Sequence, residues 1–239
     1  MKREIVLDTE TTGLKPEDGH RIVEIGAVEL IDGVKTGKTL QIYINPEREM
    51  DEVVIAVHGI TNEFVKDKPR FNEIVDEFLT FIKDSILVIH NADFDIKFLN
   101  SELDRANKGK LWDYVKNVIC TLKLDKRLYA EERKHSLDAM CNRFEIDNSN
   151  REFHGALLDS ELLAECYIRI NKDYSPEEIE ADLEQINWVR PEIKRYENLS
   201  FKVVQLTAQE EENHMNFLEN LAKKDKVTPV FSKTNSPRP

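Results

Sequence analysis

Two carboxylates one residue apart are the first groups in this sequence that could do chemistry. Asp8 and Glu10 follow the apolar run Ile5-Val6-Leu7, which is short and β-branched and therefore predicts a buried strand. Side chains alternate across a strand, so both acids point to the same face and repel each other. A divalent cation such as Mg²⁺ or Mn²⁺ would relieve the repulsion, since these ions prefer carboxylate oxygens. Simple solvation at a strand end is the alternative, because most charged side chains lie at the surface.

Two further acids weigh against simple solvation. Asp95 follows a fully apolar run at 86–89 and lies near the start of a predicted helix, and Asp159 lies in a second helical pattern at 154–170. Four carboxylates suit a site for two metal ions about 4 Å apart, which clamp the attacking and leaving oxygens of a phosphodiester. The sequence therefore predicts phosphodiester chemistry at these four acids.

His154 is the candidate general base. It precedes Asp159 by five residues, so on one helix the two side chains would lie about 140° apart. We therefore expect His154 on the loop before the helix and Asp159 in the first turns. The unperturbed pKa of a histidine, about 6.5, suits a base that takes a proton from water at neutral pH. A single histidine is more often structural, so its role depends on the acids beside it.

The elements that must position these residues predict an α/β fold. We expect three antiparallel strands first, with a hairpin turn at Asp32-Gly33, and then strands that alternate with helices. Thr11, Thr12 and Gly13 should turn the chain after the first strand, where Gly13 permits a conformation with positive φ. The expected strands are 5–7, 21–30, 40–44, 86–89 and 118–120, and the expected helices are 71–82, 95–103, 122–129, 136–144 and 154–170. This order predicts a mixed five-stranded sheet flanked by helices, with ligands at the strand ends.

The composition changes at Ser175, which predicts an extension after the first domain. Ser175 should cap a short acidic helix with Pro176 at its first position. Thr207 and Glu210 form a capping-box pattern before a further helix with apolar positions at Met215, Leu218 and Leu221. The last residues, 227–239, are polar and without periodicity, so we expect disorder. The predicted division is 1–172, 173–226 and 227–239.

The overall composition argues against several classes of protein. A net charge of −12 over 239 residues argues against a protein that holds nucleic acid through a broad basic face. No apolar run approaches the roughly 18 residues of a membrane span. Because the chain enters its first strand at once, we expect no signal peptide. The three cysteines show no C-x-x-C spacing, so we expect buried free thiols and a cytoplasmic protein.

Three motifs together resemble those of the DEDDh family of 3′→5′ exonucleases. They are D-x-E-T-T-G from Asp8, H-N-A-x-F-D ending at Asp95, and H-x-A-x-x-D from His154 to Asp159. The resemblance covers residues 1–172 and implies a ribonuclease H-like fold. It also implies removal of 3′-terminal nucleotides with two Mg²⁺ or Mn²⁺ ions held by Asp8, Glu10, Asp95 and Asp159, with His154 as the base. Asp93, two residues before Asp95, departs from the common pattern, and we expect it to be a helix N-terminal acid rather than a ligand.

Within this family, the segments 24–27, 57–60, 135–138 and 154–159 are most similar to the epsilon proofreading subunits of bacterial DNA polymerase III. The similarity implies that mispaired nucleotides are removed from a single-stranded or frayed 3′ end of DNA. The segment from Leu199 to Leu221 resembles the part that docks on the polymerase alpha subunit, and a theta-like small subunit is a further implied partner. No Gln-rich segment that would bind a sliding clamp follows residue 172.

The resemblance also implies the residues that contact the substrate. Thr11, Gly13 and Leu14 would line the pocket of the terminal nucleotide, and the base, the sugar or the next nucleotide would be contacted by His58, Asn91 and Phe94. Phe94 offers a stacking face that serves any base, with core packing as the alternative. Two other functions stay open: a stand-alone DEDDh nuclease that trims RNA or repairs DNA, and a non-catalytic adaptor.

Overall fold

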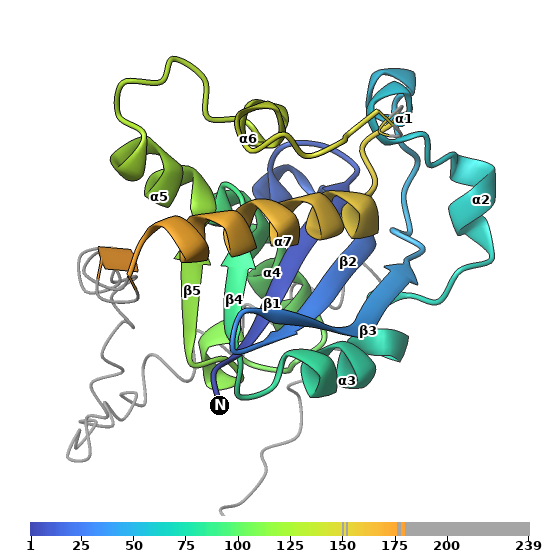
Figure 1. Cartoon of the computed structure of the whole chain (residues 1–239). Coiled ribbons are helices and arrows are strands. Elements are labelled where there is room, and N and C mark those ends of the chain that lie inside the picture. Colours follow the sequence, from blue (N-terminus) through green and yellow to red (C-terminus); the bar gives the residue numbers. More distant parts are fainter. Residues whose placement is uncertain (150, 152, 176–177, 180–239) are drawn as a thin grey trace, which may run out of the picture. The chain divides into compact units, whose positions relative to one another are not determined.

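The computed structural model describes residues 1–149, 151, 153–175 and 178–179, and a five-stranded mixed sheet forms the centre of this part (Figure 1). The strands are β1 (Arg3–Thr11), β2 (Ile22–Ile31), β3 (Val34–Tyr43), β4 (Ile86–Ile89) and β5 (Asn117–Cys120), in the order β3-β2-β1-β4-β5. β1 pairs antiparallel with β2 and parallel with β4. The predicted mixed sheet is confirmed, and the two apolar strands lie side by side at its centre.

Helices cover both faces of this sheet. They are α1 (Glu52–His58), α2 (Asn62–Lys66), α3 (Phe71–Ile82), α4 (Ala92–Arg105), α5 (Thr121–Leu128), α6 (Leu137–Arg143) and α7 (Ala156–Asp173), with short 3₁₀ turns η1 (Pro16–Asp18) and η2 (Leu111–Asp113). α7 crosses the face seen in Figure 1. Ile5 and Leu7 of β1 pack with residues of α3 and α4, whereas Val6 packs with residues of α6 and α7. The strand alternation thus divides the core into two layers.

The first hairpin follows the prediction at its turn but not in its length. Asp32 and Gly33 have φ angles of 49° and 77°, as a two-residue type I′ turn requires. β3 begins at Val34, six residues before the predicted start at Leu40. Residues 34–39 are all exposed, so they carry no apolar alternation from which a strand could be predicted.

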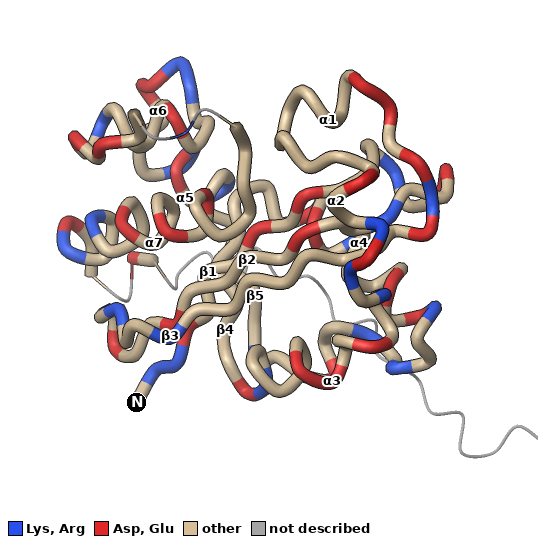
Figure 2. Tube along the Cα trace, turned by 90° about the vertical axis from the view of Figure 1, so that its right-hand side faces the viewer, with Lys and Arg blue, Asp and Glu red and all other residues tan. Residues whose placement is uncertain are grey.

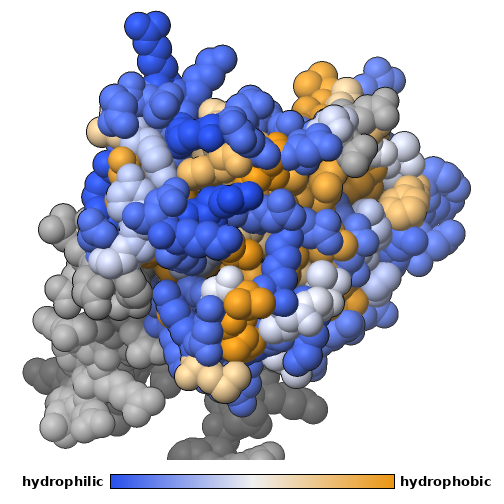
Figure 3. All heavy atoms as spheres, viewed as in Figure 1, coloured by the Kyte–Doolittle hydropathy of each residue, from blue (hydrophilic) through white to orange (hydrophobic). Residues whose placement is uncertain are grey.

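The surface of the described part mixes charge signs. Lys and Arg are scattered along the trace with Asp and Glu between them (Figure 2), and the face over α7 is largely hydrophilic with small apolar patches (Figure 3). Cys120, Cys141 and Cys166 are buried and free, which confirms the expectation for the thiols. No helix among the described residues is long and apolar enough to cross a membrane.

The predicted extension lies mostly outside the described residues. The capping box at Thr207, the apolar positions between Leu199 and Leu221 and the tail 227–239 all fall there. Ser175 and Glu178 are described, and they exchange two backbone-to-side-chain hydrogen bonds that confirm Ser175 as a cap. Ile179 is buried in the same core layer as α7, so the folded body extends beyond residue 172.

Candidate active site

The four acids converge because β1 and β4 are parallel neighbours. Val6 of β1 pairs with Val88 of β4, so the chain that leaves β4 enters α4 beside the end of β1. Asp95 in the first turn of α4 thereby reaches β1, where the Thr9 hydroxyl donates a hydrogen bond of 2.7 Å to Asp95 Oδ1. The first turn of α7 supplies Asp159, which is buried. The structure thus brings together acids that are separated by up to 151 residues in the sequence.

Burial, with repulsion between neighbouring acids at Asp8 and Glu10, raises the pKa values of three of these acids. Burial raises the pKa of Asp8 well above its ordinary value, and the charges of Asp95, Glu10 and Asp159 raise it further. Burial and then the Asp159 charge raise the pKa of Glu10 to about 8. Burial also raises the pKa of Asp95 to about 7, against the hydrogen bond from Thr9. Carboxylates that are costly to ionise together are suited to hard divalent cations, so these residues fit a metal centre.

His154 lies where the sequence predicts, on the loop before α7. Its backbone N–H donates a hydrogen bond of 3.1 Å to the Val57 carbonyl of α1, and the neighbouring Phe153 ring lies over Gly59. The side chain of His154 is 51% exposed, and its Nδ1 is 3.5 Å from Asp159 Oδ2. Glu10, His154 and Asp159 each offer one ligand atom, and these atoms lie within 4.8 Å of one another. A water molecule among them would be within reach of His154.

The start of α7 is held against the sheet by contacts with β2. Glu24 Oε2 accepts a hydrogen bond of 3.0 Å from the Ala156 N–H at the first position of the helix. Ser160 Oγ donates to the Gly26 carbonyl at 3.0 Å. A Cβ on Gly26 would lie 2.1 Å from backbone atoms of Ala156 and Leu157. The Glu24-to-Ala27 segment, which the sequence analysis matched only by resemblance, therefore positions Asp159.

Arg151 is a site residue that the sequence analysis missed. Its Nε and Nη2 donate to the two oxygens of Asp159 at 2.6 and 2.7 Å, and Nη1 donates to Asp138 Oδ1 at 2.8 Å. Nη2 also lies 2.9 Å from His154 Nδ1. Its charge lowers the pKa values of Asp8 and Glu10. An arginine is not by its residue type a candidate for a metal site. The signal that could have identified Arg151 was its position three residues before His154.

A groove of about 610 Å³ contains three of the predicted substrate residues, Leu14, Asn91 and Phe94. Leu14 is largely exposed. Asn91 has a φ of 61° at the N-cap of α4, a left-handed conformation that Asn tolerates better than most residues. Phe94 is half-buried against Phe98, with ring centroids 5.0 Å apart. Phe94 thus packs on the core and also lines the groove, so its role in stacking stays a prediction.

Gly13, in the turn before this groove, does not use the left-handed conformation that glycine permits. A side chain is excluded there for another reason: a Cβ would lie 2.3 to 2.6 Å from the His20 ring. Thr11 Oγ1 donates to the Gly13 carbonyl at 2.7 Å, so Thr11 and Gly13 shape the turn that presents Leu14.

His58 lies at the other side of the site, beside the His154 loop. It is buried, and its Nδ1 accepts a hydrogen bond of 3.0 Å from the Ile60 N–H. Its Nε2 has no hydrogen-bond partner within the part of the chain that the structure describes. Burial lowers the pKa of His58, and a weaker contact with the Thr11 backbone raises it in part. Because Nδ1 accepts from Ile60, the proton of the neutral ring is on Nε2, which faces the Thr11 backbone.

Asp93 and Asp95 have different partners, although both lie in the first turn of α4. Asp93 forms an ion pair of 3.3 Å with Lys123, while Asp95 bonds to Thr9 inside the site.

Comparison with known proteins identifies the family of this site. The exonuclease family RNase_T matches residues 5–167. The chain belongs to this exonuclease family. DNA polymerase III subunit epsilon of Rickettsia felis is 44% identical over 225 residues, which cover 92% of this chain and 97% of the relative. The corresponding subunit of Pasteurella multocida is 40% identical over 239 residues, covering 97% and 94%. The predicted resemblance to the epsilon subunits is therefore confirmed, and the stand-alone nuclease and adaptor alternatives are disfavoured.

Solved structures confirm the ribonuclease H-like exonuclease fold. Exonuclease X in complex with 5′ overhanging duplex DNA has a TM-score of 0.58 at 27% identity, covering 74% of this chain and 96% of that one. The nuclease domain of 3′hExo, a DEDDh family member bound to rAMP, has a TM-score of 0.63 at 24% identity, covering 72% and 92%.

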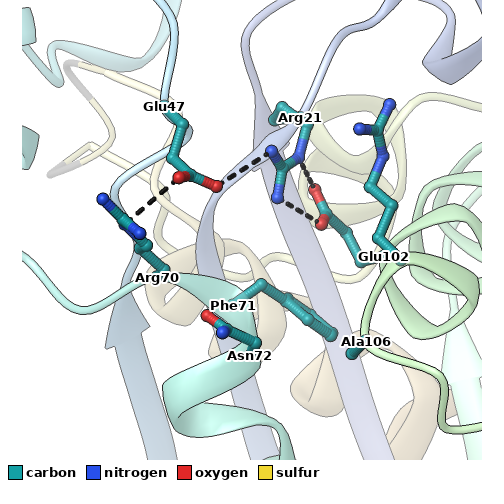
Figure 4. Close-up of a pocket in the computed structure, with 8 residues that line it drawn as sticks. Arg21, Glu47, Arg70, Phe71, Asn72, Glu102 and Ala106 are labelled. Atoms are coloured by element: carbon teal, nitrogen blue, oxygen red, sulfur yellow. Dashed lines mark hydrogen bonds and ion pairs between the residues drawn. The ribbon is translucent and has the colours of Figure 1, made fainter. Parts of the chain in front are cut away.

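A second cavity of this exonuclease, of about 250 Å³, contains none of the predicted site residues (Figure 4). Arg21 makes a two-pronged ion pair with the buried Glu102, and Glu47 bridges Arg21 and Arg70. These pairs join the start of β2 to α4 and to the residue before α3. We interpret them as structural, because the opposite charges are satisfied by one another.

Proposed function

We propose that this chain is the proofreading subunit of a replicative DNA polymerase III, a 3′→5′ exonuclease that removes mispaired 3′-terminal nucleotides from DNA. The observation that carries the proposal is the convergence of Asp8, Glu10, Asp95 and Asp159 beside His154. It occurs in a chain that aligns over nearly its full length with epsilon subunits.

The four acids would hold two divalent cations, Mg²⁺ or Mn²⁺. Such ions neutralise charge on the phosphate oxygens and lower the pKa of water. His154 takes the proton of the attacking water, whose oxygen bonds to the terminal phosphorus. The bond from phosphorus to the 3′ oxygen of the preceding nucleotide breaks, and this oxygen takes a proton from solvent. The products are a nucleoside 5′-monophosphate and a strand that is one nucleotide shorter and ends in a 3′-hydroxyl. General base catalysis of this kind contributes about 10²–10⁴-fold to a rate.

The groove that contains Leu14, Asn91 and Phe94 would bind the end of the DNA strand. Phe94 offers a ring to the terminal bases, which favours stacking without sequence preference. Lys15 and Lys97 also line the groove, and their charges suit the backbone phosphates of one strand. His58, through its buried Nε2–H, is suited to donate to the terminal nucleotide. A groove that takes an unpaired end would favour mispaired termini, because they fray more readily than paired ones.

Residues 173–226 would dock on the polymerase alpha subunit, and a theta-like subunit would be a further partner. The match with the Rickettsia felis subunit supports this, because it spans 225 residues and so extends beyond the nuclease match at 5–167. The relatives of this chain are bacterial and its described cysteines are buried free thiols, which supports a cytoplasmic location.

The activity can be tested on 5′-labelled DNA. Single strands and duplexes with a mispaired 3′ end should be shortened stepwise from that end faster than fully paired duplexes. EDTA should abolish the reaction, and Mg²⁺ or Mn²⁺ should restore it. Full activity in EDTA would contradict the metal centre, and preference for RNA over DNA would favour the stand-alone nuclease.

Docking requires a separate experiment. Because Ile179 packs in the core, the shortened chain should end after this residue rather than at 172. This chain should still digest single-stranded DNA but should no longer co-elute with the alpha subunit. Retained co-elution would place the docking surface on the nuclease body.

A further inference from the structure

Arg151 forms hydrogen bonds with two groups on which the proposed reaction depends, the Asp159 carboxylate and the His154 ring. It binds both oxygens of Asp159, at 2.6 and 2.7 Å, and lies 2.9 Å from His154 Nδ1. Its side chain is only 9% exposed. A fork-to-fork contact of this kind is among the strongest that a carboxylate makes in a protein. A cation bound by Asp159 must use the same carboxylate oxygens.

The contact with His154 also has a chemical consequence. A guanidinium nitrogen can only donate, so Nδ1 of His154 must be the acceptor in this hydrogen bond. In the neutral ring the proton is then on Nε2. Neither ring nitrogen can take a proton from water while this contact lasts. Arg151 must therefore leave His154 before the ring can act as a base.

A second carboxylate is in place to keep the guanidinium nearby. Asp138 Oδ1 accepts from Arg151 Nη1 at 2.8 Å and from Asn148 Nδ2 at 3.0 Å. Asp138 is 53% exposed, whereas Asp159 is 5% exposed. Arg151 can therefore keep one partner at the rim of the site when it gives up Asp159.

We propose that Arg151 is a positioning residue that competes with a divalent cation for Asp159 and occupies His154 until that cation displaces it. The inference rests on the proposed function, because it requires a cation at Asp159. It goes further in two respects. Arg151 sets the affinity of the site for the cation, and cation binding to the acids frees His154 to act as the base.

The first experiment measures Mn²⁺ binding by titration calorimetry on the full chain without DNA. In Arg151→Gln the dissociation constant should fall by about tenfold or more, since a full positive charge is removed from beside the acids. The control is Arg143→Gln, a similarly buried arginine that pairs with Asp125 instead. It should leave Mn²⁺ binding unchanged. Unchanged or weaker binding in Arg151→Gln would overturn the inference while the metal centre stands. Absence of binding to the wild type would overturn both.

Asp138→Asn should change the affinity for Mn²⁺ in the opposite direction. Without its outer partner the guanidinium should stay on Asp159, so Mn²⁺ binding should weaken. In the Arg151→Gln background the same change should have much less effect, and the difference between the two measures the coupling. An Asp138 effect of equal size in both backgrounds would indicate simple charge, not displacement of Arg151, and would overturn the inference.

Thermal unfolding separates this role from a purely structural one. In EDTA, Arg151→Gln should unfold at a lower temperature than the wild type, because Asp159 loses its buried partner. In saturating Mn²⁺ this deficit should disappear. Equal losses under both conditions would mean that Arg151 only holds its loop, contrary to the proposal.

Discussion

Gly26→Ala should disable the site without touching any residue that does chemistry. The added Cβ would lie 2.1 Å from backbone atoms of Ala156 and Leu157, and ordinary contact begins near 3.4 Å, so α7 must move by about 1.3 Å. Backbone atoms cannot turn aside as a side chain can. Such overpacking typically costs about 1–3 kcal/mol, and a displacement of about 1 Å can lower a rate by about 10²-fold.

The assay compares kcat on single-stranded DNA and the unfolding temperature of Gly26→Ala with those of Gly155→Ala. Gly155 lies at the start of the same helix in extended backbone, and a Cβ there meets nothing within 4 Å. The control should lose no more than about 1 kcal/mol, because alanine is a poorer N-cap than glycine, and should keep most of its activity. Wild-type kcat and stability in Gly26→Ala would refute the reasoning, since they would mean that the position of α7 is not set by this contact. An equal loss in Gly155→Ala would assign the effect to the loop.

Three further predictions address the acids and the base. Asp95→Asn should abolish nuclease activity and Asp93→Asn should retain most of it, because only Asp95 bonds into the site; the reverse result in a gel assay would contradict the assigned register. His154→Ala should lower kcat by about 10²–10⁴-fold with metal binding little changed, and unaltered single-turnover rates would remove His154 from the mechanism. The folded pKa of Glu10, about 8, lies above its ordinary 4.5, so ionisation opposes folding and this penalty grows as pH rises from about 4 through 8. Scanning calorimetry should therefore show Mg²⁺ or Mn²⁺ stabilising the protein more at pH 8 than at pH 5, and Glu10→Gln should flatten that difference; equal stabilisation at both pH values would contradict the raised pKa.

Local patterns were sufficient for much of the fold. The apolar runs before Asp8 and at 86–89 predicted β1 and β4, and helical spacing predicted α3 within its observed bounds. Where burial leaves no pattern, prediction failed: the outer half of β3 is exposed on both faces, and α1 was not predicted at all. A short or exposed element has too few buried positions to reveal its period.

For the site, the residue types and spacing identified the family and predicted the acids and the base, because motif residues lie within a few positions of one another. Only the tertiary structure decided their partners: Thr9 for Asp95, Glu24 for the start of α7, and Arg151 for Asp159. It also replaced the expected backbone role of Gly13 by a steric one. These contacts depend on strand register and on where a helix crosses the sheet, and the packing of both core layers sets them together. A sequence pattern shows the periodicity of each helix or strand, but it does not show how that element packs against its neighbours.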